Sequence, residues 1–279
     1  MKEKTLSQNV IRQFAQHLYQ EEKSKATIDK YLRDVTSFFQ FVGNETITKD
    51  LVIGWKQHLQ EKNYAVRSIN SMLASVNCLL CFLELEECKT KSLRQQRQSY
   101  CTEDQELTKE EYKRLLKAAQ KQPQLMLVME TICATGIRVS ELKYFTVEAV
   151  RRGEIIIHCK SKTRTILIPG KLKKLLLRHA SGRDIKGGPI FVTKRGNPLD
   201  RSNIWAQMKG LCIKAGVKRG KVFPHNLRKL FARTFYGIEK DIAKLADILG
   251  HSSIDTTRIY IMTTGKEQRR KMERLGLLI

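Results

Sequence analysis

The chain of 279 residues is 41% hydrophobic and carries a formal charge of +24, from 52 Lys and Arg against 28 Asp and Glu. This length suits two ordinary domains, since a domain usually runs to about 100 to 200 residues. The sequence has no run of about 18 apolar residues, and its N-terminus lacks the apolar segment of a secretory signal, so we expect a soluble, intracellular protein and no membrane partner.

The positive charge is concentrated in the second part of the chain. Residues 1–100 hold 15 basic and 11 acidic residues, which leaves 37 and 17 for residues 101–279. Such an excess favours a polyanionic partner, with most phosphate contacts made by the second part. On charge alone, a ribosomal or other RNA-binding protein and a merely well-solvated surface remain open.

The first ninety residues show only the 3.6-residue period of amphipathic helices. Ser24 and Thr48 are cap-type residues directly before two of the periodic segments. We expect four helices and hence a small all-α domain. The apolar positions of the four predicted helices are Val10, Phe14 and Leu18; Ile28, Tyr31, Leu32, Val35, Phe38, Phe39 and Val42; Leu51, Trp55 and Leu59; and Val66, Ile69, Leu73, Val76, Leu80 and Leu83.

A polar segment, which we place at about 87–106, interrupts the apolar rhythm and has the composition of an exposed linker. Thr108 and Glu111 then form the pattern of a capping box that opens the next helix. We therefore predict one domain over residues 1–100 and a second over 107–279.

The second domain is predicted to be mainly α-helical with a small antiparallel β-sheet. The β-branched runs EIIIHC and RTILIP flank a turn of Lys160, Ser161, Lys162 and Thr163, which predicts a hairpin. A third short strand, Pro189 to Val192, is expected to join it. Further helices are expected over Leu125–Ala134, Leu172–His179, Ser202–Ala215, Leu227–Tyr236 and Asp241–Leu249.

The seven cysteines, at 78, 81, 88, 101, 133, 159 and 212, do not form the regular framework of a disulfide scaffold. Cys78 and Cys81 make a CxxC inside an apolar helical run, but no second ligand pair follows to complete a zinc site. We expect reduced thiols, with this pair packed in the core.

Several residues could act together on a phosphodiester. Cleaving that bond without a metal requires fixed cations, and the planar, permanently charged guanidinium of Arg can donate two parallel hydrogen bonds to a phosphate. Arg138 follows Gly136 at the end of an apolar helix, and His225 and Arg228 are three residues apart on one helix face. Taken alone, Arg138 is better explained as a surface residue that caps a helix, and the pair could equally be a histidine at a helix start with a solvated arginine.

Three segments, in order and spacing, resemble the signature boxes of the tyrosine recombinase, or phage integrase, family: ATGIRVSEL at 134–142, PHNLRKLFAR at 224–233 and LGHSSIDTTRIY at 249–260. The helical first domain resembles the SAM-like core-binding domain of that family. The resemblance therefore covers nearly the whole chain and implies a C-terminal catalytic domain.

The resemblance implies a role for each matched residue. Arg138 and Arg228 would clamp the scissile phosphate, His225 would transfer a proton, and His251 would support the phosphate from a turn after Gly250. Ser252 or Ser253 can cap the helix that leads from this turn to Tyr260. Tyr260, otherwise an ordinary core aromatic, would be the nucleophile. A free phenol titrates near pKa 10, so it needs neighbouring cations or a base.

Three further positions follow from the same resemblance. Glu141 would hold Arg138, and a lysine of the hairpin turn would protonate the leaving 5′ oxygen. CKSKTR fits the family pattern with one turn residue missing, which favours Lys160 over Lys162. Lys229 departs from the second His that many relatives have at this position, and we regard that position as supportive and not essential.

The implied activity is site-specific recombination of double-stranded DNA through a 3′-phosphotyrosyl intermediate, without ATP, cofactor or metal. The implied partners are short inverted repeats in DNA and a homotetramer on the synapsed duplexes, with a directionality factor or a second recombinase as further candidates. We expect a bacterial, cytoplasmic, nucleoid-associated enzyme of a mobile element. Alternatives are a type IB topoisomerase and a catalytically idle DNA-binding protein of the same fold.

Overall fold

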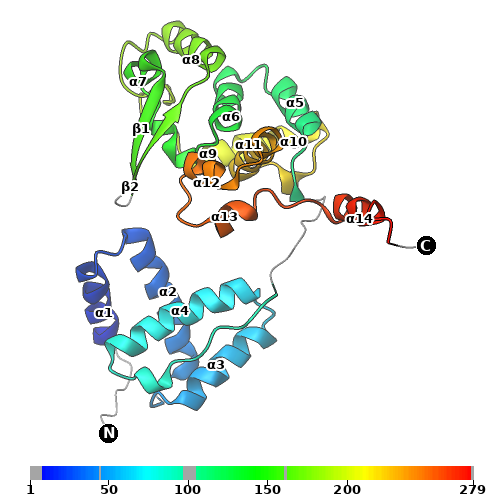
Figure 1. Ribbon diagram of the computed structural model, residues 1–279. Helices are drawn as coiled ribbons and strands as arrows, with labels where there is room; N and C mark the ends of the chain where they lie inside the picture. The colour runs from blue at the N-terminus through cyan, green and yellow to red at the C-terminus, as the bar shows by residue number, and fades with distance from the viewer. Residues whose placement is uncertain (1–7, 44, 97–104, 160–161, 278–279) are drawn as a thin grey trace. The chain divides into compact units, whose positions relative to one another are not determined.

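The computed structural model describes residues 8–43, 45–96, 105–159 and 162–277 (Figure 1). The chain divides into two compact units, Met1–Arg97 and Gln98–Ile279, and each has its own hydrophobic core. The protein is mainly α-helical with one small antiparallel sheet, as predicted.

The N-terminal unit contains the four predicted helices, α1 (Gln8–Gln20), α2 (Lys25–Val42), α3 (Lys49–Glu61) and α4 (Val66–Phe82). The hydroxyl of Ser24 accepts from the Thr27 amide and that of Thr48 from the Leu51 amide, so both predicted caps are confirmed. The core is built around Phe38 and Trp55, whose rings meet edge to face at 5.1 Å. The helices therefore bury the faces that their apolar period predicted.

The CxxC prediction was only partly right. Cys78 is half-buried against the core, but Cys81 lies on the exposed face of α4. Residues three apart on a helix need not share the same degree of burial when the apolar stripe is narrow. Within the described ranges, no group of three or more His, Cys, Asp or Glu side chains could hold a metal ion.

The C-terminal unit begins with α5 (Lys109–Ala118), and Thr108 and Glu111 form the predicted capping box. The central pair of this unit is α6 (Pro123–Thr135) and α11 (Pro224–Glu239), which pack against each other (Figure 1). Their contact sets the spacing between the two arginine-bearing segments. The remaining helices are α7 (Val147–Arg152), α8 (Gly170–Gly182), α9 (Arg201–Gly210), α10 (Cys212–Ala215), α12 (Ile242–Leu249), α13 (Ile254–Arg258) and α14 (Gly265–Glu273), with short 3-10 turns at Val139–Tyr144 and Arg219–Lys221.

The turn that connects the two strands of the hairpin is shorter than predicted. Strands β1 (Glu154–Cys159) and β2 (Lys162–Leu167) pair from Glu154 opposite Leu167 to Cys159 opposite Lys162. Lys162 and Thr163 are therefore strand residues, and only two residues connect the strands. Both connecting residues, including Lys160, lie outside the described part of the chain.

Two predictions in this unit were wrong. The segment Pro189–Val192 makes only isolated bridges, Thr146 with Pro189 and Val192 with Pro198, and does not join the sheet. Proline has no amide hydrogen to extend a ladder, which explains why pairing stops there. The predicted helix Ser202–Ala215 is two helices, α9 and α10, divided at Leu211.

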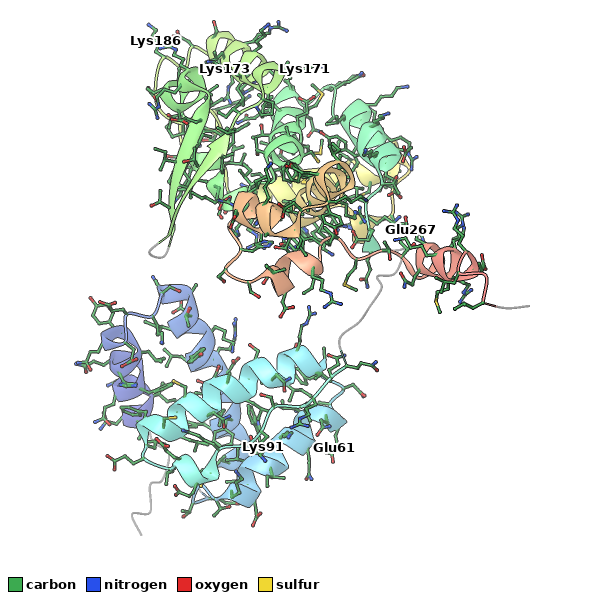
Figure 2. The ribbon with its side chains drawn as sticks, in the orientation of Figure 1. Glu61, Lys91, Lys171, Lys173, Lys186 and Glu267 are labelled. Carbon is green, nitrogen blue, oxygen red and sulfur yellow. The ribbon has the colours of Figure 1, made fainter. Side chains whose placement is uncertain are left out.

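Three lysines lie at one end of this unit. Figure 2 shows Lys171 and Lys173 on α8 and Lys186 in the segment that follows it, all at the end of the unit where α7 and α8 lie. Lys171 and Lys186 are exposed, whereas the ammonium of Lys173 donates to the Arg151 carbonyl.

Candidate active site

Arg138 is positioned by a tight turn at the end of α6. Gly136 there has a φ of +65°, and a Cβ on it would lie 2.4 Å from the Phe231 ring, so only glycine fits. Beyond the turn, the Arg138 amide donates to Glu141 Oε2 at 2.7 Å and its guanidinium donates to Oε1 at 3.1 Å. The side chain of Arg138 stays 41% exposed, so it keeps donors for a ligand.

The C-terminus of α12 is the point on which the arginines converge. Three successive carbonyls accept from three guanidinium groups: Ile248 from Arg164 at 3.0 Å, Leu249 from Arg228 at 2.6 Å and Gly250 from Arg138 at 3.3 Å. The last carbonyls of a helix have no partner inside the helix and carry the negative end of its dipole. They therefore stabilise a cluster of like charges that would otherwise repel one another.

Arg228 is the most buried of these residues, with 1% of its surface exposed. It donates to the Gly136 carbonyl at 2.5 Å and to Leu249, while its Nε is buried without a hydrogen-bond partner among the described residues. Burial and the neighbouring Arg138 lower its pKa to about 10. Arg228 thus stays cationic at neutral pH, and its Nε can donate a hydrogen bond to a bound anion.

His251 is held from both sides of its ring. Nδ1 lies 2.8 Å from the Thr257 hydroxyl and Nε2 lies 3.0 Å from Arg228. Because a guanidinium can only donate, Nε2 must accept and the proton must be on Nδ1. Burial, Arg228 and Arg138 lower the pKa of His251 to about 4, in agreement with a neutral ring. In this arrangement the ring orients Arg228.

Tyr260 lies between two histidine rings. Its ring meets His225 at 5.1 Å and His251 at 4.9 Å, both edge to face, and the guanidinium carbon of Arg228 is 6.0 Å from its centroid. The residue is 7% exposed and packs on Leu249. Its place near these groups comes from α13, which Ser253 caps and which ends two residues before it.

His225 is at the start of α11, on the same side as Arg228. Part of its ring is in contact with solvent, but burial of the rest, followed by the charges of Lys229, Arg228, Arg138 and Arg201, lowers its pKa. A neutral imidazole is therefore favoured at pH 7, and a neutral imidazole can accept a proton.

The structure brings together six of the seven residues singled out from the sequence: Arg138, Glu141, His225, Arg228, His251 and Tyr260. The seventh, Lys160, lies outside the described residues, and for Lys162 only the backbone position at the start of β2 is described.

Arg164 belongs to the cluster but was not predicted as a site residue, and the partner of Lys229 was not predicted either. Arg164 of β2 contacts Glu141 and α12, and its only local signal was its place after the two hairpin lysines. Lys229, at the position where many relatives have a histidine, pairs instead with Glu106 at 3.0 Å, as does Arg233 at 2.6 Å. These ion pairs hold the segment before α5 against α11.

The lowered pKa of His251 predicts a pH-dependent stability. The unfolded chain binds a proton on this residue near pH 6.5, whereas the folded chain does so only near pH 4, so stability should fall as pH drops through this window. His251→Gln should flatten that dependence in part, because His225 and His179 contribute in the same direction. Denaturant midpoints at pH 5 and pH 7.5 measure this dependence, and a loss of stability between the two pH values that is as large in the variant as in the wild type would contradict the neutral, half-buried ring.

Comparisons with known proteins match both units. The phage integrase family matches residues 105–267, and the phage integrase N-terminal SAM-like domain matches residues 11–87. The chain is 32% identical to tyrosine recombinase XerA of Pyrococcus furiosus over 286 residues, which is 100% of this chain and 98% of the relative.

Solved structures share the fold. A lambda integrase tetramer bound to a Holliday junction aligns with a TM-score of 0.72 and 18% identity, over 92% of this chain and 77% of that one. The XerH recombinase bound to its difH substrate in a pre-cleavage complex aligns with a TM-score of 0.69 and 17% identity, over 99% and 91%. No helix among the described residues is long and apolar enough to cross a membrane.

Proposed function

Because this chain belongs to the phage integrase family and is a site-specific DNA recombinase, we propose that it cleaves DNA by the attack of Tyr260 on a phosphate held by Arg138 and Arg228. The observation that carries this assignment is the convergence of Arg228 and two histidine rings on one tyrosine, with Arg138 held at the same end of α12 as Arg228. A protein that only binds DNA has no need for such a cluster, and a type IB topoisomerase finds no support among the related proteins.

The reaction proposed is a transesterification. The Tyr260 oxygen forms a bond to phosphorus while the bond to the 5′ oxygen breaks, which leaves a 3′-phosphotyrosyl link and a free 5′-hydroxyl. A 5′-hydroxyl from another strand reverses the step and rejoins the DNA. One phosphoester replaces another at each step, so the reaction needs no ATP.

The proton that leaves Tyr260 needs an acceptor beside the phenol. His225 meets the Tyr260 ring, and its lowered pKa favours the neutral form that accepts a proton. The 5′ oxygen needs a donor, and we assign this role to Lys160 in the hairpin turn. No metal is required in this scheme, because side chains supply the cations.

The two arginines would bind different non-bridging oxygens of the phosphate. Arg138 is partly exposed and is held by Glu141, so it can meet a non-bridging oxygen without a change in the fold. The guanidinium carbon of Arg228 lies 6.0 Å from the centre of the Tyr260 ring, and its Nε has no partner among the described residues. A second non-bridging oxygen would satisfy that donor. Charge that grows on these oxygens in the transition state is then stabilised by fixed donors.

We place DNA recognition across both domains, with residues 1–100 as the core-binding domain and 107–279 as the catalytic domain. The enzyme would act as a homotetramer on two synapsed duplexes with short inverted repeats, in the cytoplasm where the DNA of its host lies. The tail beyond Thr263 is the candidate for docking on a neighbouring protomer, since α14 begins with a capping box and Met272, Leu275 and Leu277 are 62%, 63% and 81% exposed.

This function is tested with a nicked duplex that loses a short strand after cleavage. Because the lost strand cannot rejoin, the covalent complex is trapped. Candidate inverted repeats from the genomic flanks of the gene supply the substrates. Peptide mapping of the trapped complex should identify Tyr260, and an end label should show a free 5′-hydroxyl. EDTA should leave the yield unchanged. A link through a 5′ phosphate, or loss of the complex with EDTA, would contradict the proposal.

A first mutational prediction concerns the phosphate clamp. Arg138→Ala should lower the rate of complex formation by about 10²- to 10³-fold, the usual cost of one donor to a transition-state oxyanion, and change affinity far less. Arg228→Lys is the better variant at the second position, because the residue also holds two carbonyls. It should show a loss of similar size.

The matched control for this prediction is Arg178→Ala, which removes one exposed arginine from α8. It should cleave at the wild-type rate. Rates and dissociation constants on the same duplex separate the two effects, and a defect of Arg138→Ala confined to affinity would reduce that residue to an ordinary phosphate contact.

A further inference from the structure

Lys229 lies one helical turn after His225 on α11. Residues four apart on a helix are neighbours on its surface, with about 5 to 6 Å between their Cβ atoms. The Lys229 ammonium donates to Glu106 Oε1 at 3.0 Å, and the two side chains are only 19% and 8% exposed. The ammonium is therefore held close to α11 and does not extend into solvent as that of an ordinary surface lysine does.

The segment that carries Glu106 is itself fixed to α11. The buried amide of Asn226 donates to the Gln105 carbonyl at 2.7 Å. The guanidinium of Arg233 donates to the Leu107 carbonyl at 2.5 Å. These two contacts lie on either side of Glu106 in the chain. The carboxylate therefore has a fixed place, and it fixes the ammonium that is bound to it.

The ion-pair cluster of Glu106, Lys229 and Arg233 keeps an excess of positive charge. Glu106 accepts from Lys229 on one oxygen at 3.0 Å and from Arg233 on the other at 2.6 Å. One carboxylate cannot neutralise two cations, so one positive charge remains. Along the helix axis, Lys229 is about 6 Å from His225 and Arg233 is about 12 Å from it, so Lys229 is the cation that acts on the histidine.

His225 is surrounded by groups from several elements. Burial, and next to it the charge of Lys229 ahead of three arginines, lowers the pKa of His225. A cation beside an imidazole disfavours the imidazolium, because like charges repel. The charged and titratable groups near the ring are Lys229 and Arg228 of α11, Arg138 after α6, Arg201 of α9, His251 after α12 and Tyr260 after α13.

Lys229 differs from the arginines of the clamp in what DNA would do to its charge. A bound phosphate would offset the charges of Arg138 and Arg228, because both would donate to its oxygens. The partner of Lys229 is a carboxylate of the protein itself, which is already shared with Arg233. The charge of Lys229 would therefore continue to act on His225 when DNA is bound.

We infer that Lys229 keeps His225 ready to accept the proton of Tyr260 and so sets the lowest pH at which cleavage runs at its full rate. Lys229 is a positioning residue in this role, because it acts on the reaction only through His225. The inference rests on the proposed function, since it assumes that His225 is the proton acceptor. It gives a use to the lysine that this chain has in place of the second histidine of many relatives.

The test is the pH profile of covalent-complex formation, from pH 5 to pH 9, in Lys229→Gln. Glutamine can still donate to Glu106, and Arg233 continues to compensate that carboxylate, so we expect the fold to survive. Loss of the cation should raise the pKa of His225, and the acidic side of the profile should move to higher pH by about half a unit or more, the effect of one charge at about 6 Å in water. The rate at pH 6 should fall about threefold or more, and the rate at pH 8.5 should stay near that of the wild type.

Three variants serve as controls for the charge of Lys229. Lys229→Arg keeps the charge and should keep the wild-type profile, whereas Lys229→Met removes the charge and should repeat the shift of Lys229→Gln. Arg233→Gln removes the other cation from the same carboxylate and should leave the profile unshifted, even if its melting temperature falls. An unshifted profile in both neutral variants of Lys229, or an equal shift in Lys229→Arg or Arg233→Gln, would overturn the role of Lys229.

A titration of the histidine NMR signals of the DNA-free protein separates this inference from the proposed function. The His225 signal is identified by its loss in His225→Gln, and its pKa should be higher in Lys229→Gln than in the wild type. An unchanged pKa would overturn the inference whatever the cleavage assay shows. The proposed function fails in a different way, if the wild type forms no complex through Tyr260 or if His225→Gln keeps the acidic side of the profile.

Discussion

Tyr260→Phe is expected to form no covalent complex with DNA, while it binds the same duplex with nearly unchanged affinity. Only the hydroxyl is lost, and the phenyl ring can keep its edge-to-face contacts with His225 and His251 and its packing on Leu249. Because the nucleophilic oxygen itself is removed, the rate should fall below detection. The nicked suicide duplex and a gel-shift titration measure the two quantities.

Tyr236→Phe is the matched control, because this tyrosine of α11 packs against the same small cluster of apolar side chains. It should form the covalent complex at the wild-type rate. A complex that persists in Tyr260→Phe but is lost in Tyr236→Phe would move the nucleophile, and one that persists in both would remove tyrosines of this cluster from the mechanism.

Lys160→Ala is expected to slow cleavage of a normal 5′-oxygen substrate by roughly 10²- to 10⁴-fold, the range of general-acid catalysis. Lys162→Ala should have a much smaller effect. A bridging 5′ sulfur should restore Lys160→Ala, because the thiolate needs no proton. The same substrate should fail to restore Arg138→Ala, whose loss concerns the non-bridging oxygens.

The two lysines are each other's control. Restoration of Lys162→Ala by sulfur, with Lys160→Ala near normal on oxygen, would identify Lys162 as the proton donor. The two-residue turn places Lys162 at the first position of β2, opposite Cys159, so this alternative involves a strand residue. Restoration of neither variant would exclude the hairpin and leave His225 as the next candidate.

Local features were predictable because they depend on residues a few positions apart. Ser24, Thr48 and Thr108 were identified as caps since a cap joins a side chain to an amide three residues later. Residue types did not predict the structure correctly where contacts between more distant residues decide the strand pairing. Pro189–Val192 was predicted as a strand from its residue types, but the prolines at 189 and 198 restrict pairing to isolated bridges.

The amino-acid sequence by itself determined the family, the two-part organisation and the residues of the candidate site. Three boxes in the right order identified Arg138, Glu141, His225, Arg228, His251 and Tyr260. This succeeded because each box is a short segment whose residue types have few other uses in that combination.

Only the tertiary structure decided how those residues act on one another. Arg138, Arg164 and Arg228 come from separate segments, and each meets a carbonyl at the end of α12, in one case from a residue 112 positions away. No local pattern encodes such a contact, because it depends on the packing of α6, α11 and the hairpin around that helix end. The same packing places Arg164 in the cluster, pairs Lys229 with Glu106 and sets the proton of His251 on Nδ1, since a ring nitrogen beside a guanidinium can only accept from it.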